Sequence, residues 1–247
     1  MAASPGSAIR GDALDSAGTD DRQFNVQAQG SSDPRYFLEA WTPMMHGRQD
    51  LKRKKVLNVG GNSKAIPLPP QYAEFEHVLL DIDAKAAPDI VCDARQLATL
   101  GAGQFDAVYC SHNLEHYYHH DVPRVLAGFL HVLKDDGFAQ IVVPDIGELM
   151  RLAVERGLDI DDGVVESPAG PITVLEVLYG HSLEIERSGQ DFFSHKTGFT
   201  EKSLLKALHQ AGYAKVYSAA RNLEIDALAF KTMPGPGTRA LFNLPDG

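Results

Sequence analysis

Two glycines flanked by amides follow a predicted buried strand at 56–59. Gly60-Gly61 stand between Asn58 and Asn62. Glycine adopts left-handed backbone conformations without steric penalty, so such a pair suits a tight turn in which a ligand approaches the main chain. An ordinary strand-to-loop turn has the same composition. The glycine pair therefore indicates a ligand site only together with the residues that follow the other strands.

Carboxylates follow the next two predicted strands, 77–82 and 89–92. Asp81 lies roughly 20 residues beyond the glycines, a spacing at which an acidic side chain accepts both ribose hydroxyls of an adenine nucleoside. Asp83 is the second candidate for this role. After the third strand, the Asp93 carboxylate can accept from an adenine amino group, and the Ala94 backbone N–H can reach a ring nitrogen. Ligands of open parallel sheets lie at the carboxyl ends of strands, so we expect these residues to meet.

A histidine-rich segment, SHNLEH at 111–116, follows the fourth predicted strand at 105–110. On a continuous helix, His112, His116 and His120 would share one face, an arrangement that suits zinc. No cysteine or carboxylate trio converges on this segment in the sequence, so we expect no metal. Glu115 is expected to be a structural partner for a backbone or basic group.

Two histidines are candidates for removing a proton, because imidazole titrates near neutral pH. His112 follows the fourth strand directly, and His195 lies in a less regular stretch at 158–199. For His195, a loop hydrogen bond is an equally good interpretation. Phe192, Phe193 and Phe199 in the same region fit either the floor of a substrate pocket or the core.

The segments that position these residues alternate between strand and helix patterns. A fifth strand is expected at 139–144 and two closing strands at 214–220 and 224–230. Helices are expected from Val122 to about Leu133 with Asp121 as N-cap, and at 146–157, 171–179 and 200–212. This alternation predicts an α/β fold, a Rossmann-like, doubly wound and mostly parallel seven-stranded sheet with a late antiparallel strand.

The domain organisation follows from composition along the chain. Residues 1–32 lack a hydrophobic period and are expected to be a disordered extension. Residues 33–247 are expected to form a single domain with a helical and loop insertion at about 158–199. The tail at 234–247 carries so much proline and glycine that no regular structure is expected there.

Composition and charge restrict the class of protein. The chain has 247 residues and a net charge of −10, which disfavours nucleic acid as a partner. No apolar run approaches the roughly 18 residues of a spanning helix, and no signal peptide is recognisable, so a cytoplasmic protein without a membrane partner is expected. The two cysteines are expected to be reduced thiols.

Four of these strings together resemble a known family: VLNVGG, LLDID, DIVCDARQL and FDAVYCSHNLEHYYHHDVPRVLAGFLHVLKDDGFAQIVVPD. They are similar to the class I S-adenosylmethionine-dependent methyltransferases, in particular the small-molecule, type 11-like branch. The resemblance spans about 55–145, and the stretch 198–213 is similar to that family's late helix.

The resemblance implies roles for individual positions. Gly60 and its neighbours would line the methionine moiety of S-adenosylmethionine, Asp81 would hold the ribose, and Asp93 with Ala94 would hold the adenine. Ser111 and His112 would face the sulfonium and the methyl acceptor. No metal is implied.

The first motif departs from the family pattern, which has glycine at every second position. Asn62 and Lys64 occupy the second and third of these positions. Asparagine tolerates the left-handed conformation, whereas Lys64 implies either a partner for the cofactor carboxylate or a rearranged loop.

The function expected from this resemblance is methyl transfer to a small-molecule acceptor, the hydroxyl or amine of a sugar, natural product or metabolite. One alternative is a non-catalytic relative that binds the cofactor without turnover. Another is an NAD-dependent dehydrogenase, although the glycines lack the G-x-G-x-x-G spacing. The oligomeric state is not apparent from the sequence.

Overall fold

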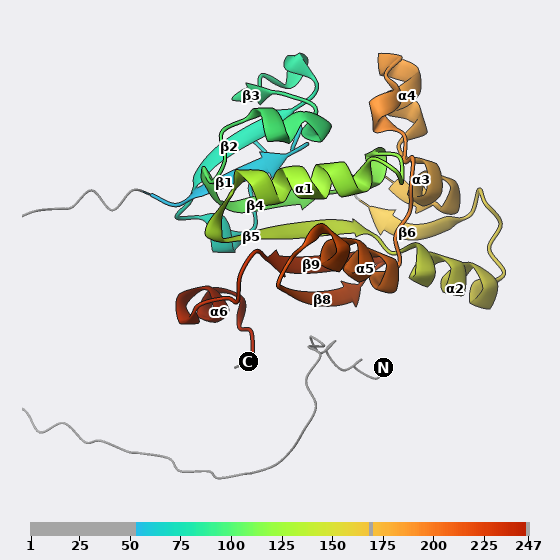
Figure 1. Cartoon of the computed structure of the whole chain (residues 1–247). Helices are drawn as coiled ribbons and strands as arrows, with labels where there is room; N and C mark the ends of the chain where they lie inside the picture. The colour runs from blue at the N-terminus through green and yellow to red at the C-terminus, as the bar shows by residue number, and fades with distance from the viewer. Residues whose placement is uncertain (1–52, 168–169, 246–247) are drawn as a thin grey trace, which may run out of the picture. The chain divides into compact units, whose positions relative to one another are not determined.

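The core of the protein is one seven-stranded sheet. A computed structural model describes residues 53–167 and 170–245. The strand order is β3-β2-β1-β4-β5-β9-β8 (Figure 1). Their bounds are β1 Lys55–Val59, β2 Glu76–Asp81, β3 Ile90–Val91, β4 Phe105–Ser111, β5 Leu133–Pro144, β8 Lys215–Arg221 and β9 Glu224–Phe230.

Strand directions agree with the predicted fold class. The pairs from β3 through β5 are all parallel, and β9 runs antiparallel to both β5 and β8. The Rossmann-like α/β sheet with one late antiparallel strand is therefore confirmed. The chain passes from β1 to β2 and β3 on one side and returns to β4 on the other side of β1. The carboxyl end of β1 thus lies at a switch in strand order, the place where such sheets bind ligands.

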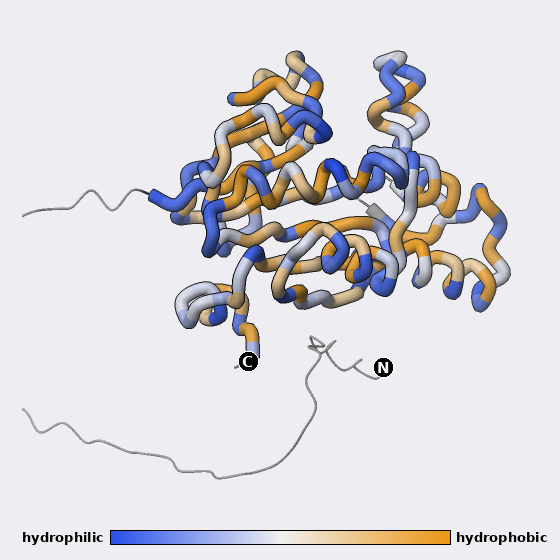
Figure 2. The backbone as a smooth tube through the Cα atoms, in the orientation of Figure 1, coloured by the Kyte–Doolittle hydropathy of each residue, from blue (hydrophilic) through white to orange (hydrophobic). Residues whose placement is uncertain are grey.

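One face of the sheet is covered by α1 Val122–Val132, α5 Glu201–Ala211 and the short 3₁₀ helix η4 Ala94–Thr99 (Figure 1). Buried side chains from all three, including Leu97, Phe129 and Leu208, pack on strand residues such as Leu57. Figure 2 shows hydrophobic residues running along the strands beneath them. The apolar spacing that predicted α1 and α5 is thus the spacing of their buried faces.

The start of α1 differs from the prediction in one detail. Asp121 precedes the helix, but its side chain makes no capping hydrogen bond. Its Oδ2 instead accepts from Arg95 Nη1 at 3.3 Å. The end differs as well, because Leu133 already belongs to β5, which begins six residues before the predicted strand.

The opposite face of the sheet is covered by η2 Pro70–Tyr72 and by α6 Pro236–Phe242. The expectation that the tail has no regular structure is wrong, because α6 forms there. Pro236 stands in its first turn, where a proline is tolerated because its missing N–H would have no partner. Phe242 and Leu244 pack against Phe138 and Phe230 of the sheet, which stabilises the short helix.

The insertion contains more structure than the sequence indicated. After α2 Ile146–Arg156, which ends at the left-handed Gly157 as predicted, a hairpin forms from β6 Gly163–Ser167 and β7 Gly170–Thr173. The helix predicted from 171 begins only at Val174, since residues 170–173 pair in β7. Thr173 forms the capping box of α3 Val174–Tyr179. α4 Ser182–Ser188 and η6 Asp191–Phe193 follow.

The predicted extension at 1–32, and residues 33–52, lie outside the residues that the structure describes. Within the described ranges, no helix combines the length and the hydropathy needed to cross a bilayer. Both cysteines, Cys92 and Cys110, have free thiols.

Candidate active site

The turn after β1 is shaped by its glycines. Gly60 has a φ of 71° and donates its N–H to the Leu80 carbonyl at 2.8 Å. A Cβ at Gly60 would overlap the Asn113 side chain, and one at Gly61 would overlap that of Asn58. Both positions therefore need glycine because two amide side chains pack against the turn.

Asn62 continues this turn in the left-handed region, with a φ of 58°. The departure at this position is therefore accommodated, as the conformational preference of asparagine predicts. The Lys64 side chain forms an ion pair within the protein, with its Nζ 2.6 Å from Asp89 Oδ2. The Asp89 carboxylate also accepts from the Leu79 N–H, which ties the loop to β2.

Asp81 ends β2 beside this turn, and only 9% of its surface is exposed. Its Oδ2 accepts from the Asn62 N–H at 3.1 Å and its Oδ1 from the Asp83 N–H at 2.9 Å. Each oxygen keeps a free lone pair, because a carboxylate oxygen can accept more than one hydrogen bond. The carboxylate is thus fixed between two loops with capacity to accept from a ligand.

Asp93, after β3, is engaged by Arg95. Arg95 donates from its backbone N–H and its guanidinium, with Nη2 2.6 Å from Asp93 Oδ2, and its Nη1 reaches Asp121. Burial alone would raise the pKa of Asp93, but the hydrogen bonds from Arg95 outweigh it and lower that pKa below its ordinary value. Asp93 is therefore an ionised carboxylate that shares its acceptor capacity with an arginine.

His112 follows β4 with a φ of 48°, an uncommon conformation for a residue with a side chain. Its Nδ1 lies 3.7 Å from Glu115 Oε1 and its Nε2 lies 2.9 Å from Glu224 Oε1. These carboxylates raise the pKa of His112 to about 10. At neutral pH it is an imidazolium that donates hydrogen bonds. His112 could act as the predicted base only after it loses this proton, which requires that Glu115 and Glu224 no longer stabilise the charged ring.

The predicted face of three histidines does not form. Only residues 114–116 are helical after β4, as the 3₁₀ helix η5 Leu114–His116, and Tyr117 is extended. His112, His116 and His120 therefore do not share a helix face. His116 instead meets His195 from the insertion, with ring centroids 4.9 Å apart.

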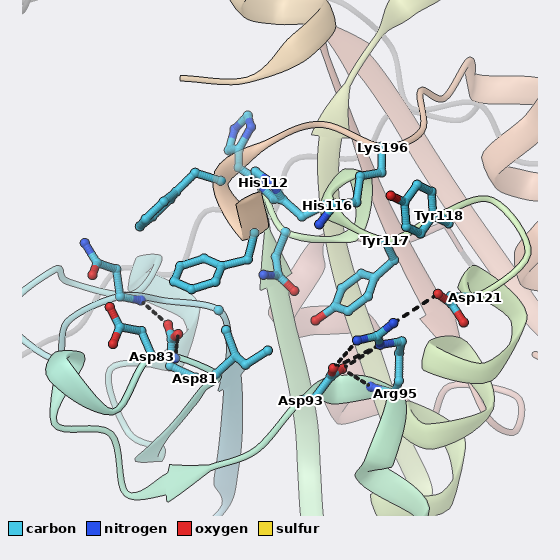
Figure 3. A pocket seen from close by; sticks show the side chains of 16 residues that line it. Asp81, Asp83, Asp93, Arg95, His112, His116, Tyr117, Tyr118, Asp121 and Lys196 are labelled. Carbon is cyan, nitrogen blue, oxygen red and sulfur yellow. Dashed lines mark hydrogen bonds and ion pairs between the residues drawn. The ribbon is translucent and has the colours of Figure 1, made fainter. Parts of the chain in front are cut away.

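The strand ends enclose a first cavity of about 210 Å³ (Figure 3). Figure 3 shows Asp81 and Asp83 on one side and Arg95 between Asp93 and Asp121 on the other. Six predicted site residues line it: Gly60, Asn62, Asp81, Asp83, Asp93 and His112. Asn58, Gly61, Ala94, Ser111 and His195 are not among its lining residues. Asn58 is buried and pairs with His77 Nε2, and Ala94 is buried at the start of η4.

Several residues of this cavity were not predicted: Ile82, Arg95, Asn113, His116, Tyr117, Tyr118, Asp121 and Lys196. Most of them lie within a few residues of a predicted position. Their place directly after a strand was the feature of the sequence that could have identified them. Lys196 comes from the insertion, as do Phe192 and Phe193, which also line the first cavity. Phe199 is instead buried in the core with 3% of its surface exposed.

A second, larger cavity of about 590 Å³ lies beside His112. Its walls include Val165, Ile172, Val177, Leu183 and Leu223, with polar groups from Glu176, His181, His195 and Glu224. His195 is 13% exposed at its side chain, and its Nδ1 lies 2.9 Å from the Val177 carbonyl oxygen. His112 lines both cavities, so it stands at their border.

Comparisons with known proteins extend this description. Residues 49–141, less than half of the chain, match a family model described as a methyltransferase domain, of the type 11 branch. Curated protein sequences give no match.

Solved structures with a similar fold include two SAM-dependent methyltransferases. The protein from Methanosarcina mazei is 16% identical, with 73% of this chain and 93% of that chain covered and a TM-score of 0.48. The one from Archaeoglobus fulgidus is 15% identical, with 72% and 86% covered and a TM-score of 0.46.

A third is the 1,6-didemethyltoxoflavin-N1-methyltransferase of Burkholderia thailandensis with bound S-adenosylhomocysteine, at 16% identity, 74% and 73% coverage and a TM-score of 0.39. The family match covers β1 to β4 and most of β5, and therefore the strand ends around the first cavity. Residues 49–141 of the chain are therefore similar to the methyltransferase domain of the type 11 branch.

Proposed function

We propose that the protein transfers a methyl group from S-adenosylmethionine in the first cavity to a small molecule in the second cavity. The observation that carries this proposal is the position of His112, which lines both cavities. A methyl donor and its acceptor must meet in line, so the residue at the border marks where the reacting atoms would lie.

The first cavity has the features that an adenine nucleoside requires. Asp81 presents free lone pairs to accept from ribose hydroxyls, and Gly60 and Asn62 of the neighbouring turn line the same cavity. Asp93 and Ala94 are proposed at the adenine end, with Asp83 beside Asp81. The cofactor supplies a methyl group that its positive sulfur already activates. What remains for the protein is to align the acceptor and exclude water.

The second cavity suits an acceptor with an apolar body and a polar group. Its aliphatic walls bury hydrocarbon, and Glu176, His181 and Glu224 offer polar contacts. We propose a sugar, natural-product or metabolite hydroxyl or amine as the acceptor, in the cytoplasm. His112 and His195 are proposed to face the reacting atoms from the side of this cavity.

The alternative of a cofactor-binding protein without turnover was motivated by Asn62 and Lys64. Neither residue argues for it now, since Asn62 adopts the left-handed turn and Lys64 pairs with Asp89. The dehydrogenase alternative has no support in the family match, which is to a methyltransferase domain.

The test is a transfer assay with radiolabelled S-adenosylmethionine and a panel of small hydroxyl and amine acceptors. Wild-type protein is compared with Ile172→Trp, whose larger ring would fill part of the second cavity. We expect transfer to an acceptor that the variant loses, while both proteins bind S-adenosylhomocysteine equally. Binding without transfer to any acceptor would favour the non-catalytic alternative. Undiminished transfer by the variant would contradict the assignment of the second cavity.

A further inference from the structure

Three potential ligands for a metal ion meet where the two cavities approach each other. Glu115 and His116 come from η5, and His195 comes from the end of the insertion. One ligand atom from each lies within 4.8 Å of the others. His116 lines the first cavity and His195 lines the second, so the cluster is reachable from both.

Glu115 is the reason to look for a cation here. Only 1% of its surface is exposed, and no hydrogen bond reaches either carboxylate oxygen from the part of the chain that the structure describes. The nearest basic atoms are His112 Nδ1 at 3.7 Å and His195 Nε2 at 3.9 Å from its Oε1. The His112 imidazolium balances part of this charge, but neither oxygen has a partner at hydrogen-bond distance among the described residues, so the carboxylate keeps its acceptor capacity for a metal ion.

Each of the two histidines has one ring nitrogen next to a main-chain carbonyl. His116 Nδ1 lies 3.0 Å from the Ser194 carbonyl oxygen, and His195 Nδ1 lies 2.9 Å from that of Val177. A neutral imidazole that donates from Nδ1 keeps its lone pair on Nε2. Metal-binding histidines typically donate their other ring N–H to a carbonyl or carboxylate in this way.

The main chain also holds the insertion against η5. The Glu115 carbonyl oxygen accepts from the N–H groups of Lys196 at 2.8 Å and Thr197 at 3.1 Å. Both donors directly follow His195 in the chain, so these main-chain bonds hold it next to Glu115. The three ligands are therefore brought together by the backbone before an ion binds.

We propose that Glu115, His116 and His195 bind a divalent transition-metal ion. Two imidazoles and one carboxylate suit Zn²⁺, Fe²⁺, Co²⁺ or Mn²⁺, whereas Mg²⁺ and Ca²⁺ prefer oxygen ligands. Ligands about 2.1 Å from a tetrahedral ion lie about 3.4 Å apart, so small side-chain movements would close the site. Three protein ligands leave positions open for an acceptor. The site replaces the expectation of no metal and gives His195 the role of a ligand.

The role of the ion, unlike its binding, rests on the proposed function. An acceptor oxygen bound to the ion is a stronger acid, since the ion stabilises the anion. The acceptor hydroxyl would lose its proton to water and its oxygen would form a bond to the methyl carbon. The carbon–sulfur bond breaks with its electron pair going to sulfur. The hydroxyl is thereby the preferred acceptor class, ahead of the amine.

The experiment is a Co²⁺ titration of protein that has been dialysed against a chelator. The visible absorption of bound Co²⁺ and the metal content after gel filtration are both measured. The variants are His116→Gln and His195→Gln, with His119→Gln as the matched control, because His119 is an exposed histidine of the same segment outside the cluster. Melting temperatures and S-adenosylhomocysteine binding are measured for all four proteins.

We expect one equivalent of Co²⁺ in wild type and in His119→Gln, with at least about tenfold weaker binding in both cluster variants, a loss that even outer-shell changes cause. Absence of bound Co²⁺ in wild type, or equal binding by His195→Gln, would overturn the proposal. S-adenosylhomocysteine binding in His195→Gln shows that the variant is folded. Co²⁺ binding without S-adenosylhomocysteine binding would instead refute the proposed function and leave the metal site standing.

Discussion

Gly60 and Gly103 have similar backbone conformations, with φ of 71° and 64°, in different surroundings. A Cβ at Gly60 would overlap the Asn113 side chain, whereas no heavy atom lies within 4 Å of a Cβ at Gly103. Each alanine substitution costs about 1–2 kcal/mol for the left-handed conformation. We expect Gly60→Ala to exceed that cost and to lose S-adenosylhomocysteine binding, because the overlap displaces the turn.

Urea denaturation and calorimetry of the two variants test this prediction. Gly103→Ala is the control for backbone strain alone and is expected to bind like wild type. Equal stabilities and equal binding of the two variants would mean that Asn113 gives way and that the close approach at Gly60 has no role.

At the residue scale, the sequence predicted that Asp81 and Asp93 would lie near each other, and both line the first cavity. Asp81 and Asp93 were predicted because a parallel sheet gathers its carboxyl strand ends, whatever the side chains between them. The pairing of Asp93 with Arg95 was not predicted, although the two are close in sequence, because it depends on a rotamer. The meeting of His116 with His195 was also beyond prediction, since it depends on how the insertion folds back.

At the scale of elements, α5 connects the capping signal of the sequence with the core. Thr200 accepts from the Ser203 N–H and forms a capping box, and Leu204 and Leu208 of α5 are fully buried. Loss of an N-cap hydroxyl costs about 0.5–2 kcal/mol. We expect Thr200→Ala to lower the free energy of unfolding by this amount and Thr200→Ser to keep it, as measured by urea denaturation.

The same substitution separates stability from binding. No residue of α5 is among those that line the first cavity, so S-adenosylhomocysteine affinity should be unchanged in Thr200→Ala. A drop in affinity, or an equal loss of stability in the serine variant, would contradict this account of the helix.

Elements with strong periodicity were predicted well, and short ones were not. The sheet, α1, α2 and α5 follow from apolar spacing and from turn residues such as Gly157 and Gly212. α6 was missed because its proline and glycine content argued against a helix, while its packing on Phe138 and Phe230 outweighs that preference. In the insertion, β6, β7 and α4 are too short for a periodic signal.

At the scale of the whole described chain, the sheet and the insertion line mainly different cavities. Strand ends provide most of the wall of the first cavity, and the hairpin β6–β7 with α3 provides much of the second. His112 at the end of β4 joins the two, and the loop at 194–197 returns to η5 beside it. In the proposed function, the strand ends would bind the cofactor and the insertion would select the acceptor.

The most direct test of this account is a calorimetric titration of S-adenosylhomocysteine into wild type, Asp81→Asn and the control Asp135→Asn. Asp135 is an aspartate whose side chain is 99% exposed. An amide at position 81 has one oxygen where two N–H groups now bind, and it carries no charge. We expect about 10- to 100-fold weaker binding in Asp81→Asn, matching the loss of a charge-assisted hydrogen bond. Equal binding by all three proteins would contradict the placement of the cofactor in the first cavity.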